Sequence, residues 1–248
     1  MTDAGNSKPQ APVRRGTERQ RAYETLKSAI LNGVLQRGER LSEVRVMRDF
    51  DLGRTPLREA FNRLEREGLV ASEPNIGYSV ANLDIDDVCD LLIVREGLDG
   101  IAAEIAATVA TPADLDRLRA VMAEIEALAT RTQRDAETYA RELKLGLLVH
   151  EMILEITGNR ALSEFSERVY DQLRLALWLE VRWIDVSADT VTEHRAIIDA
   201  LIARDPVAAA QAARAHVRSS RDNMQTLKKV HDLRRSDGRR LPVSKGKA

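Results

Sequence analysis

The segment from Arg54 to Gly68 restricts the possible folds of this chain more than any other. Thr55 is a good N-cap residue, because its hydroxyl can accept a hydrogen bond from a free backbone N–H of the first turn. Pro56 would then take the first helical position, where its missing N–H costs nothing, and Gly68 is a typical helix stop. Apolar residues recur between them at helical spacing, namely Leu57, Ala60, Phe61 and Leu64. The sequence therefore predicts a short amphipathic helix with one buried face.

The polar residues of this helix allow two interpretations. Arg54, Arg58 and Asn62 lie off the apolar stripe and can point away from a core. A short helix with a buried back and arginine near its N-terminus is how a helix-turn-helix protein addresses a DNA major groove. Ordinary amphipathic helices also carry solvated arginines. The helix alone therefore leaves both interpretations open.

The flanking sequence completes the pattern of a winged helix-turn-helix. A first helix is predicted from Thr17 to about Asn32, and a second begins after Ser42. The third helix is followed by two short apolar runs, 69–72 and 78–80, around the breaker 74–77, which is a β-hairpin pattern. Gly77 would let the backbone of this wing approach a minor groove closely. We assign residues 1–16 to a flexible arm and residues 17–82 to a DNA-binding domain.

Residues 83–233 are predicted to be entirely helical and to form a separate domain. Asp84 and Thr111 are N-cap candidates, and Thr111 is followed by Pro112 at a first helical position. Six helices are expected, at about 84–107, 111–129, 134–157, 160–183, 188–203 and 206–232. The tail, residues 234–248, is basic and polar, and we predict that it is disordered. The expected fold class is mainly α: an N-terminal winged helix-turn-helix plus a C-terminal all-α six-helix bundle.

Composition limits the compartment and the kind of nucleic-acid binding. The net charge is -1, so any affinity for DNA must come from a local patch; residues 11–80 hold thirteen Lys/Arg and ten Asp/Glu. Cys89 is the single cysteine, which excludes an intrachain disulfide and fits a reducing cytoplasm. The sequence has no long apolar run and no signal-peptide pattern. We therefore expect a cytoplasmic protein with no membrane partner.

Residues 20–230 of the sequence resemble a known family. Residues 23–80 are similar to the N-terminal domain of GntR-type transcriptional regulators, and the remainder resembles the FCD effector-binding domain of the FadR-like subgroup. The N-terminal resemblance is carried by Ile30, Gly33, Gly38, Leu41, Ser42, Glu43, the run 54–60, Leu64, Gly68, Leu69 and Gly77. The C-terminal resemblance is carried by Arg95, Leu98, Asp99, His150, Gly158, Asn159, the run 193–197, Asp205, Ala209 and His216.

The resemblance implies a concrete function. Such proteins are homodimers that bind a palindromic operator in double-stranded DNA through the winged domain. A small carboxylic-acid effector held in the helical domain changes their affinity for the operator, and most of them repress. We therefore expect a ligand-responsive transcriptional regulator, a repressor rather than an activator, and not an enzyme.

The same resemblance implies which residues contact DNA. They are Arg45, Arg54, Thr55, Arg58, Asn75 and Gly77. An arginine fork can pair bidentately with guanine, and a helix N-terminus can hold a phosphate. Three positions depart from the family pattern. Val44 stands where many relatives carry arginine, Gly53 replaces Ser or Thr, and Ile76 replaces a basic residue before the wing glycine.

Three histidines fall where metal-binding FCD proteins place their imidazole ligands: His150, His194 and His216. Three converging imidazoles could hold Zn²⁺ or Ni²⁺ and leave positions open for an effector carboxylate. The family's fourth ligand is an aspartate, and this chain has Gly146 instead. Neither Glu142 nor Glu151 is an obvious substitute at its helical position. Metal binding and direct hydrogen bonding of the histidines to an acid therefore both stay open.

Arg95 is a further candidate for effector binding. It lies on an otherwise apolar helix, where an unpaired charge would be costly. It could clamp an effector carboxylate through its planar fork, or it could pair within the chain, for example with Asp99 one turn later.

Two rival functions belong to other classes. A three-His metal-dependent hydrolase would have an open metal site, but the sequence offers no evident general base and the winged domain would be unexplained. A ligand-independent helical interaction protein is the second rival, for which Gly146 is the hint.

Overall fold

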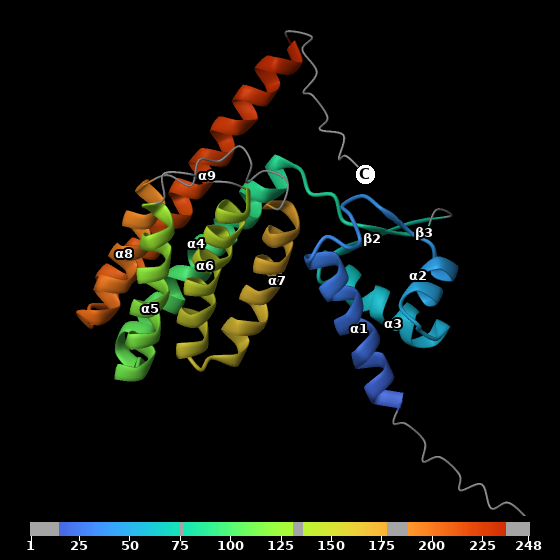
Figure 1. The fold of residues 1–248 in the computed structure, drawn as a ribbon, viewed down its shortest axis with the longest axis horizontal. Helices are drawn as coiled ribbons and strands as arrows, with labels where there is room; N and C mark the ends of the chain where they lie inside the picture. The colour runs from blue at the N-terminus through green and yellow to red at the C-terminus, as the bar shows by residue number, and fades with distance from the viewer. Residues whose placement is uncertain (1–14, 75–76, 131–135, 178–187, 237–248) are drawn as a thin grey trace, which may run out of the picture. The chain divides into compact units, whose positions relative to one another are not determined.

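The computed structural model describes residues 15–74, 77–130, 136–177 and 188–236, which are mainly helical (Figure 1). The chain divides into two compact units, Met1–Asn82 and Leu83–Ala248. No helix in these ranges is long and apolar enough to cross a membrane. The predicted arm falls outside the described residues except for its last two positions, which begin the first helix.

The first unit contains three helices and a small sheet. In chain order its elements are α1 (Arg15–Leu31), β1 (Arg40–Leu41), α2 (Glu43–Asp49), α3 (Arg54–Arg66), β2 (Val70–Glu73) and β3 (Gly77–Val80). The strands form an antiparallel sheet in the order β1-β3-β2. The winged helix-turn-helix expected from the sequence is therefore confirmed. Strand β1 was not predicted, because two residues are too few to show the alternation of polar and apolar side chains that marks a strand.

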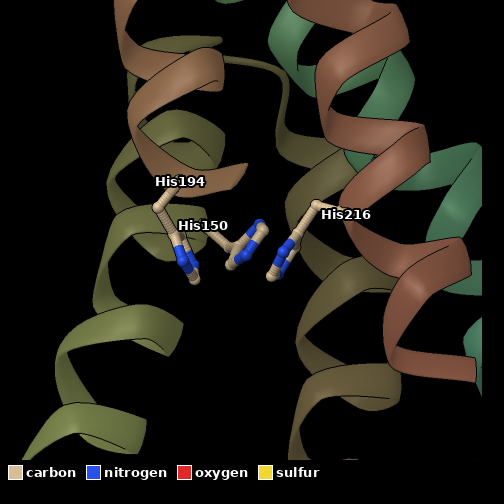
Figure 2. A group of neighbouring side chains, drawn as sticks. All are labelled: His150, His194 and His216. Atoms are coloured by element: carbon tan, nitrogen blue, oxygen red, sulfur yellow. The ribbon is translucent and has the colours of Figure 1, made fainter. Parts of the chain in front are cut away.

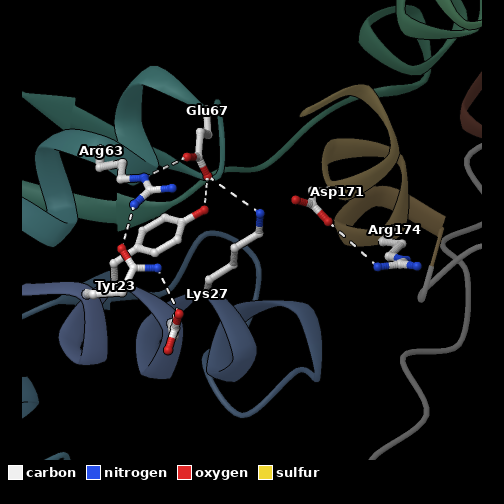
Figure 3. A network of polar contacts seen from close by, with 8 residues as sticks. Tyr23, Lys27, Arg63, Glu67, Asp171 and Arg174 are labelled. Atoms are coloured by element: carbon white, nitrogen blue, oxygen red, sulfur yellow. Dashed lines mark hydrogen bonds and ion pairs between the residues drawn. The ribbon is translucent and has the colours of Figure 1, made fainter. Parts of the chain in front are cut away.

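The apolar stripe of α3 is the centre of this unit's core. Leu57, Ala60, Phe61 and Leu64 are all buried, as their spacing predicted. A polar cluster joins the far end of α3 to α1 (Figure 3). Glu67 accepts from the Tyr23 hydroxyl at 2.8 Å and from Arg63 Nε at 3.1 Å, and the Arg63 guanidinium lies 3.5 Å from the centre of the Tyr23 ring. These contacts fix α3 against α1.

The start of α3 differs from the prediction. Gly53, not Thr55, is the N-cap residue, and the first-turn bond runs from Leu57 N–H to the Gly53 carbonyl. Pro56 therefore occupies the third helical position. Its missing N–H is tolerated there because the first-turn N–H groups have no intrahelical acceptor. Arg54 consequently belongs to the helix itself.

The second unit consists of six helices in its described ranges. They are α4 (Ile85–Val109), α5 (Pro112–Ala129), α6 (Ala136–Ile156), α7 (Arg160–Leu177), α8 (Ala188–Ile202) and α9 (Pro206–Ser236). Capping boxes form at Asp84 and Thr111, so both predicted N-caps are confirmed. The end predicted for α7, residues 178–183, lies outside the described residues. The last helix reaches Ser236, so residues 234–236 are helical rather than part of a disordered tail, and residues 237–248 lie outside the described ranges.

Helix α4 is the centre of this bundle and contacts α6, α7, α8 and α9. Its face of small residues, Ala102, Ala103, Ala106 and Ala107, is fully buried. Small side chains allow a neighbouring helix to approach closely, and α4 and α9 run side by side over much of their length (Figure 1). This arrangement brings residues of α4, α6, α8 and α9 together inside the bundle.

Candidate functional site

Three histidines from three different helices meet in the interior of the bundle (Figure 2). His150 comes from α6, His194 from α8 and His216 from α9, and all three are buried. Their ring centres lie 4.4 to 5.3 Å apart. One potential ligand atom from each residue lies within 4.8 Å of the others. The convergence expected from the resemblance is therefore present in the structure.

The Nδ1 atom of each ring is held by an oxygen outside the cluster. For His150 it lies 3.0 Å from Asp99 Oδ2, for His194 2.8 Å from the Thr190 carbonyl, and for His216 2.9 Å from Glu193 Oε2. An Nδ1 that faces an acceptor carries the proton, which leaves the Nε2 lone pair free to bind a ligand. The Nε2 atoms of His150 and His194 make no hydrogen bond within the described part of the chain.

All three imidazoles are neutral at pH 7. Burial, assisted by the nearby Arg95 charge and opposed by Asp99, lowers the pKa of His150 to about 4. Burial likewise lowers the pKa of His194 to about 3 and that of His216 to about 4. A metal ion binds the neutral form of imidazole, so the protonation state of the cluster suits a metal.

Asp99 connects the cluster to the rest of α4. Its carboxylate accepts from Arg95 Nε at 3.0 Å and from the Tyr170 hydroxyl at 2.6 Å, and also faces His150. Burial by itself would raise the pKa of Asp99, but Arg95 and His150 hold it below its usual value. Arg95 is therefore paired within the chain, as one of its two interpretations stated. Arg95 also lines the cavity next to the histidines, so its pairing with Asp99 does not remove it from the site.

A cavity of about 120 Å³ adjoins the histidines. Its lining consists of Leu92, Arg95, Ile125, Glu142, Leu143, Gly146, Leu147, His150, Thr190, Val191, His194, His216, Ser220, Asn223 and Met224. Polar groups that could bind an acid thus share one cavity with aliphatic side chains.

The acidic residues of α6 differ in their relation to this cavity. Gly146 faces it, and a Cβ atom there would lie 3.3 Å from His194 Cε1, so the missing aspartate would have stood directly beside the cluster. Glu142, which its helical position did not mark as an obvious substitute ligand, is buried and lines the same cavity. Glu151 instead pairs with Arg174, which also lies 3.7 Å from Asp171 (Figure 3).

The predicted DNA-contacting residues are mostly exposed on the first unit. Arg54, Thr55 and Arg58 lie in the first turns of α3 with exposed side chains. Arg58 Nε donates to Glu43 Oε1 at 2.8 Å, and Arg45 pairs with Glu39. These contacts leave the two arginines partly neutralised in the free protein.

The wing begins at a residue whose backbone requires glycine. Gly77 has a φ of +102°, and it is the first residue of β3. Tyr78, the next residue, donates to Asn62 Oδ1 of α3 at 2.9 Å. The wing is thereby fixed to the predicted recognition helix. Asn75 lies outside the described residues.

Comparison with known proteins decides the family. The model of the FCD domain matches residues 90–219, and that of the bacterial regulatory proteins of the gntR family matches residues 18–80. The uncharacterised HTH-type transcriptional regulator YdhC of Bacillus subtilis is 30% identical over 195 residues, which cover 78% of this chain and 85% of that protein. This chain belongs to the GntR family. The family resemblance inferred from the sequence is confirmed, and the protein is a transcriptional regulator rather than an enzyme.

Other GntR relatives agree with this assignment. The transcriptional repressor GlaR of Escherichia coli is 26% identical, with 79% of this chain and 90% of that protein covered. Among solved structures, E. coli McbR/YncC has a TM-score of 0.69 at 18% identity, covering 85% of this chain and 98% of that one. A putative GntR regulator from Rhodococcus sp. RHA1 has a TM-score of 0.67 at 22% identity over the same shares. These two structures support the fold.

Several residues of the regulator's site had no clear signal in the sequence. Asp99 was considered only as a partner for Arg95, although its spacing of four residues could not show that it also faces His150. Tyr170 is 71 residues away from Asp99 in the chain. Glu193 directly precedes His194 and yet holds His216, a contact across two helices. Long-range partners of this kind require the fold.

Proposed function

We propose that this GntR regulator binds operator DNA through its first unit, and that an organic acid bound with a divalent metal in the second unit changes its affinity for the operator. The observation that carries the proposal is the shared cavity, in which three neutral imidazoles and Arg95 lie together. Effector binding would act by shifting the population of conformations that fit the operator.

The residues present fit a Zn²⁺ or Ni²⁺ ion. His150, His194 and His216 would hold the metal, with Asp99 and Glu193 orienting two of the rings from behind. Three protein ligands leave coordination positions for water or a carboxylate. When bound, the metal would supply a positive charge and open positions for an acid. Gly146 offers no side-chain ligand, so the protein contributes three ligands rather than four.

Arg95 supports an acidic effector. A guanidinium carries five N–H donors in a planar fork, and Asp99 receives the Nε–H of Arg95. We propose that other donors of Arg95 bind the effector carboxylate. The aliphatic part of the cavity lining would then enclose the carbon skeleton of the acid.

Thermal unfolding of metal-stripped and metal-loaded protein tests this site. A ligand that binds only the folded state raises the melting temperature. We expect Zn²⁺ or Ni²⁺ to raise it, a small carboxylic acid to add a further increase when metal is present, and His194→Ala to abolish the response to metal. Gln211→Ala, a change at an exposed position of α9, is the control. An acid response that is unaffected by chelator would contradict the metal, and no response to any acid would contradict the effector.

The DNA-contacting set remains Arg45, Arg54, Thr55, Arg58, Asn75 and Gly77. Exposed arginines in the first turns of α3 and a wing attached to the same helix support it. We expect Arg54→Ala to lower affinity for an operator selected from random duplexes by about 10- to 100-fold, the value of one bidentate base contact. Arg66→Ala, at the opposite end of α3, should change it little. Fluorescence anisotropy measures both, and equal losses would contradict the assignment.

We further propose a homodimer that represses from the cytoplasm, where operator DNA is found. The similarity to GlaR, a transcriptional repressor, supports repression. Exposed aliphatic residues on α4, Ile93, Val94 and Ile101, support pairing of two copies. Ile101→Glu should shift the mass measured by analytical ultracentrifugation from dimer to monomer. Val207→Glu, an exposed valine on α9, is the control and should leave the mass unchanged.

A further inference from the structure

The cavity extends from the histidine layer toward one end of the bundle. On α6 it is lined at His150, Gly146 and Glu142, which are four residues apart and so share one helix face. Eight residues of helix span about 12 Å. Two other helices add lining residues within about two turns of their histidines: Thr190 and Val191 precede His194 on α8, and Ser220, Asn223 and Met224 follow His216 on α9. The space therefore has the histidines at one end and Glu142 at the other, and both ends are buried.

The two ends carry opposite chemistry. Arg95 and the proposed metal ligands at the histidine end attract a carboxylate. Glu142 at the other end is a buried acidic residue, only 5% exposed. A ligand long enough to reach Glu142 would place its far group against that side chain. A second carboxylate there would face the carboxyl group of Glu142 within a largely aliphatic lining, where repulsion between like charges is strong.

We propose that the effector is an amino or hydroxy acid, with its carboxylate at the histidine end and an ammonium or hydroxyl group donating to Glu142. The inference rests on the proposed function of the cavity and narrows it to one class of acid. Glu142 would act as a specificity-determining residue that excludes dicarboxylic acids. Specificity of this type needs a repulsive element against the wrong ligand as well as an attractive one for the right ligand.

Matched probes of equal chain length test the proposal. Zn²⁺-loaded regulator would be titrated with 4-aminobutanoate, 5-aminopentanoate and 6-aminohexanoate, with the corresponding hydroxy acids, and with succinate, glutarate and adipate. We expect at least one amino or hydroxy acid to bind ten times more tightly than the dicarboxylate of the same length. Thermal shift and calorimetry provide independent readouts.

The variant Glu142→Gln removes the charge and keeps the size of the side chain. It should weaken binding of the preferred amino or hydroxy acid by about tenfold and strengthen binding of the matched dicarboxylate. Glu155→Gln, on the same helix at an exposed position, is the control and should change neither. If Glu142→Gln does not fold, the ranking of probes on the unmodified protein still decides the question.

The failure of this inference differs from the failure of the proposed function. A dicarboxylate that binds the unmodified regulator as well as the amino or hydroxy acids would overturn the role of Glu142 while leaving an acid-responsive site in place. An unchanged ranking in Glu142→Gln would do the same. If no probe of any class binds, both the inference and the proposed effector site are wrong.

Discussion

Asp99 holds three different groups with one buried carboxylate. It accepts from Arg95 and Tyr170 and faces Nδ1 of His150, so it balances the arginine charge and sets which nitrogen of the histidine carries the proton. A buried charge that loses its partner is strongly destabilising. Asp99 therefore both stabilises the bundle and keeps His150 in the tautomer whose Nε2 can bind a metal.

Asp99→Asn should damage both properties. We expect the free energy of unfolding of the metal-free protein to fall by about 3–5 kcal/mol, because Arg95 is left as an unpaired buried charge. Metal affinity should fall by about 10- to 100-fold through the loss of the carboxylate behind His150. Urea unfolding and a metal-competition titration measure the two effects.

Tyr170→Phe is the matched control for this change. It removes one hydrogen bond to Asp99 but keeps the charge pair, so we expect a loss of about 1 kcal/mol and nearly unchanged metal affinity. Equal effects of the two variants would show that Asp99 acts as a packing residue only.

At the scale of elements, Gly100 is a point of especially tight packing between α4 and α9. Gly100 is buried on α4, and a Cβ atom there would lie 2.8 Å from Arg214 Cγ of α9. Gly97, one turn earlier on the same helix, is exposed and has no atom within 4 Å of the corresponding point. The two glycines thus offer the same substitution in opposite surroundings.

Gly100→Ala should lower the free energy of unfolding by about 1–3 kcal/mol, because the added methyl group forces Arg214 or α9 to move. Gly97→Ala should raise it by about 0.5–1 kcal/mol, since alanine loses less backbone entropy in a helix. Denaturant unfolding of both variants checks the pair, and a stabilised Gly100→Ala would contradict the tight packing.

Features that depend on neighbouring residues could be predicted from the sequence, whereas features that depend on contacts between distant residues could not. The caps at Asp84 and Thr111 were predictable because a capping box needs only residues three positions apart. The start of α3 was misplaced because Thr55 is an equally good cap, and backbone geometry chose Gly53. The three histidines were found by resemblance to a family, whereas Asp99 and Glu142 acquired their roles only when separate helices packed together.

At the scale of the whole molecule, the buried histidines make stability depend on pH. Their pKa values in the folded protein are about 4, 3 and 4, against 6.5 for an unperturbed histidine. Between these values the unfolded chain binds protons that the folded chain does not bind. Stability therefore rises with pH across this window and is lost as the pH falls from about 6.5 toward 4.

We expect the metal-free regulator to lose up to about 1.4 kcal/mol per pH unit for each cluster histidine in this window. Urea unfolding at a series of pH values, with chelator present, measures the slope. His194→Gln should make it shallower by about one histidine's share. A slope that is unchanged by this variant would contradict the assignment.

The outward Nδ1 contacts also determine how many protons the histidines release when a metal ion binds. Each ring already presents a neutral imidazole at pH 7, so an ion entering the cluster displaces no proton from its three protein ligands. The heat of metal binding by these ligands would then be the same in buffers of different ionisation enthalpy. Metal occupancy of the proposed site would then vary little with pH wherever the folded protein keeps all three histidines neutral.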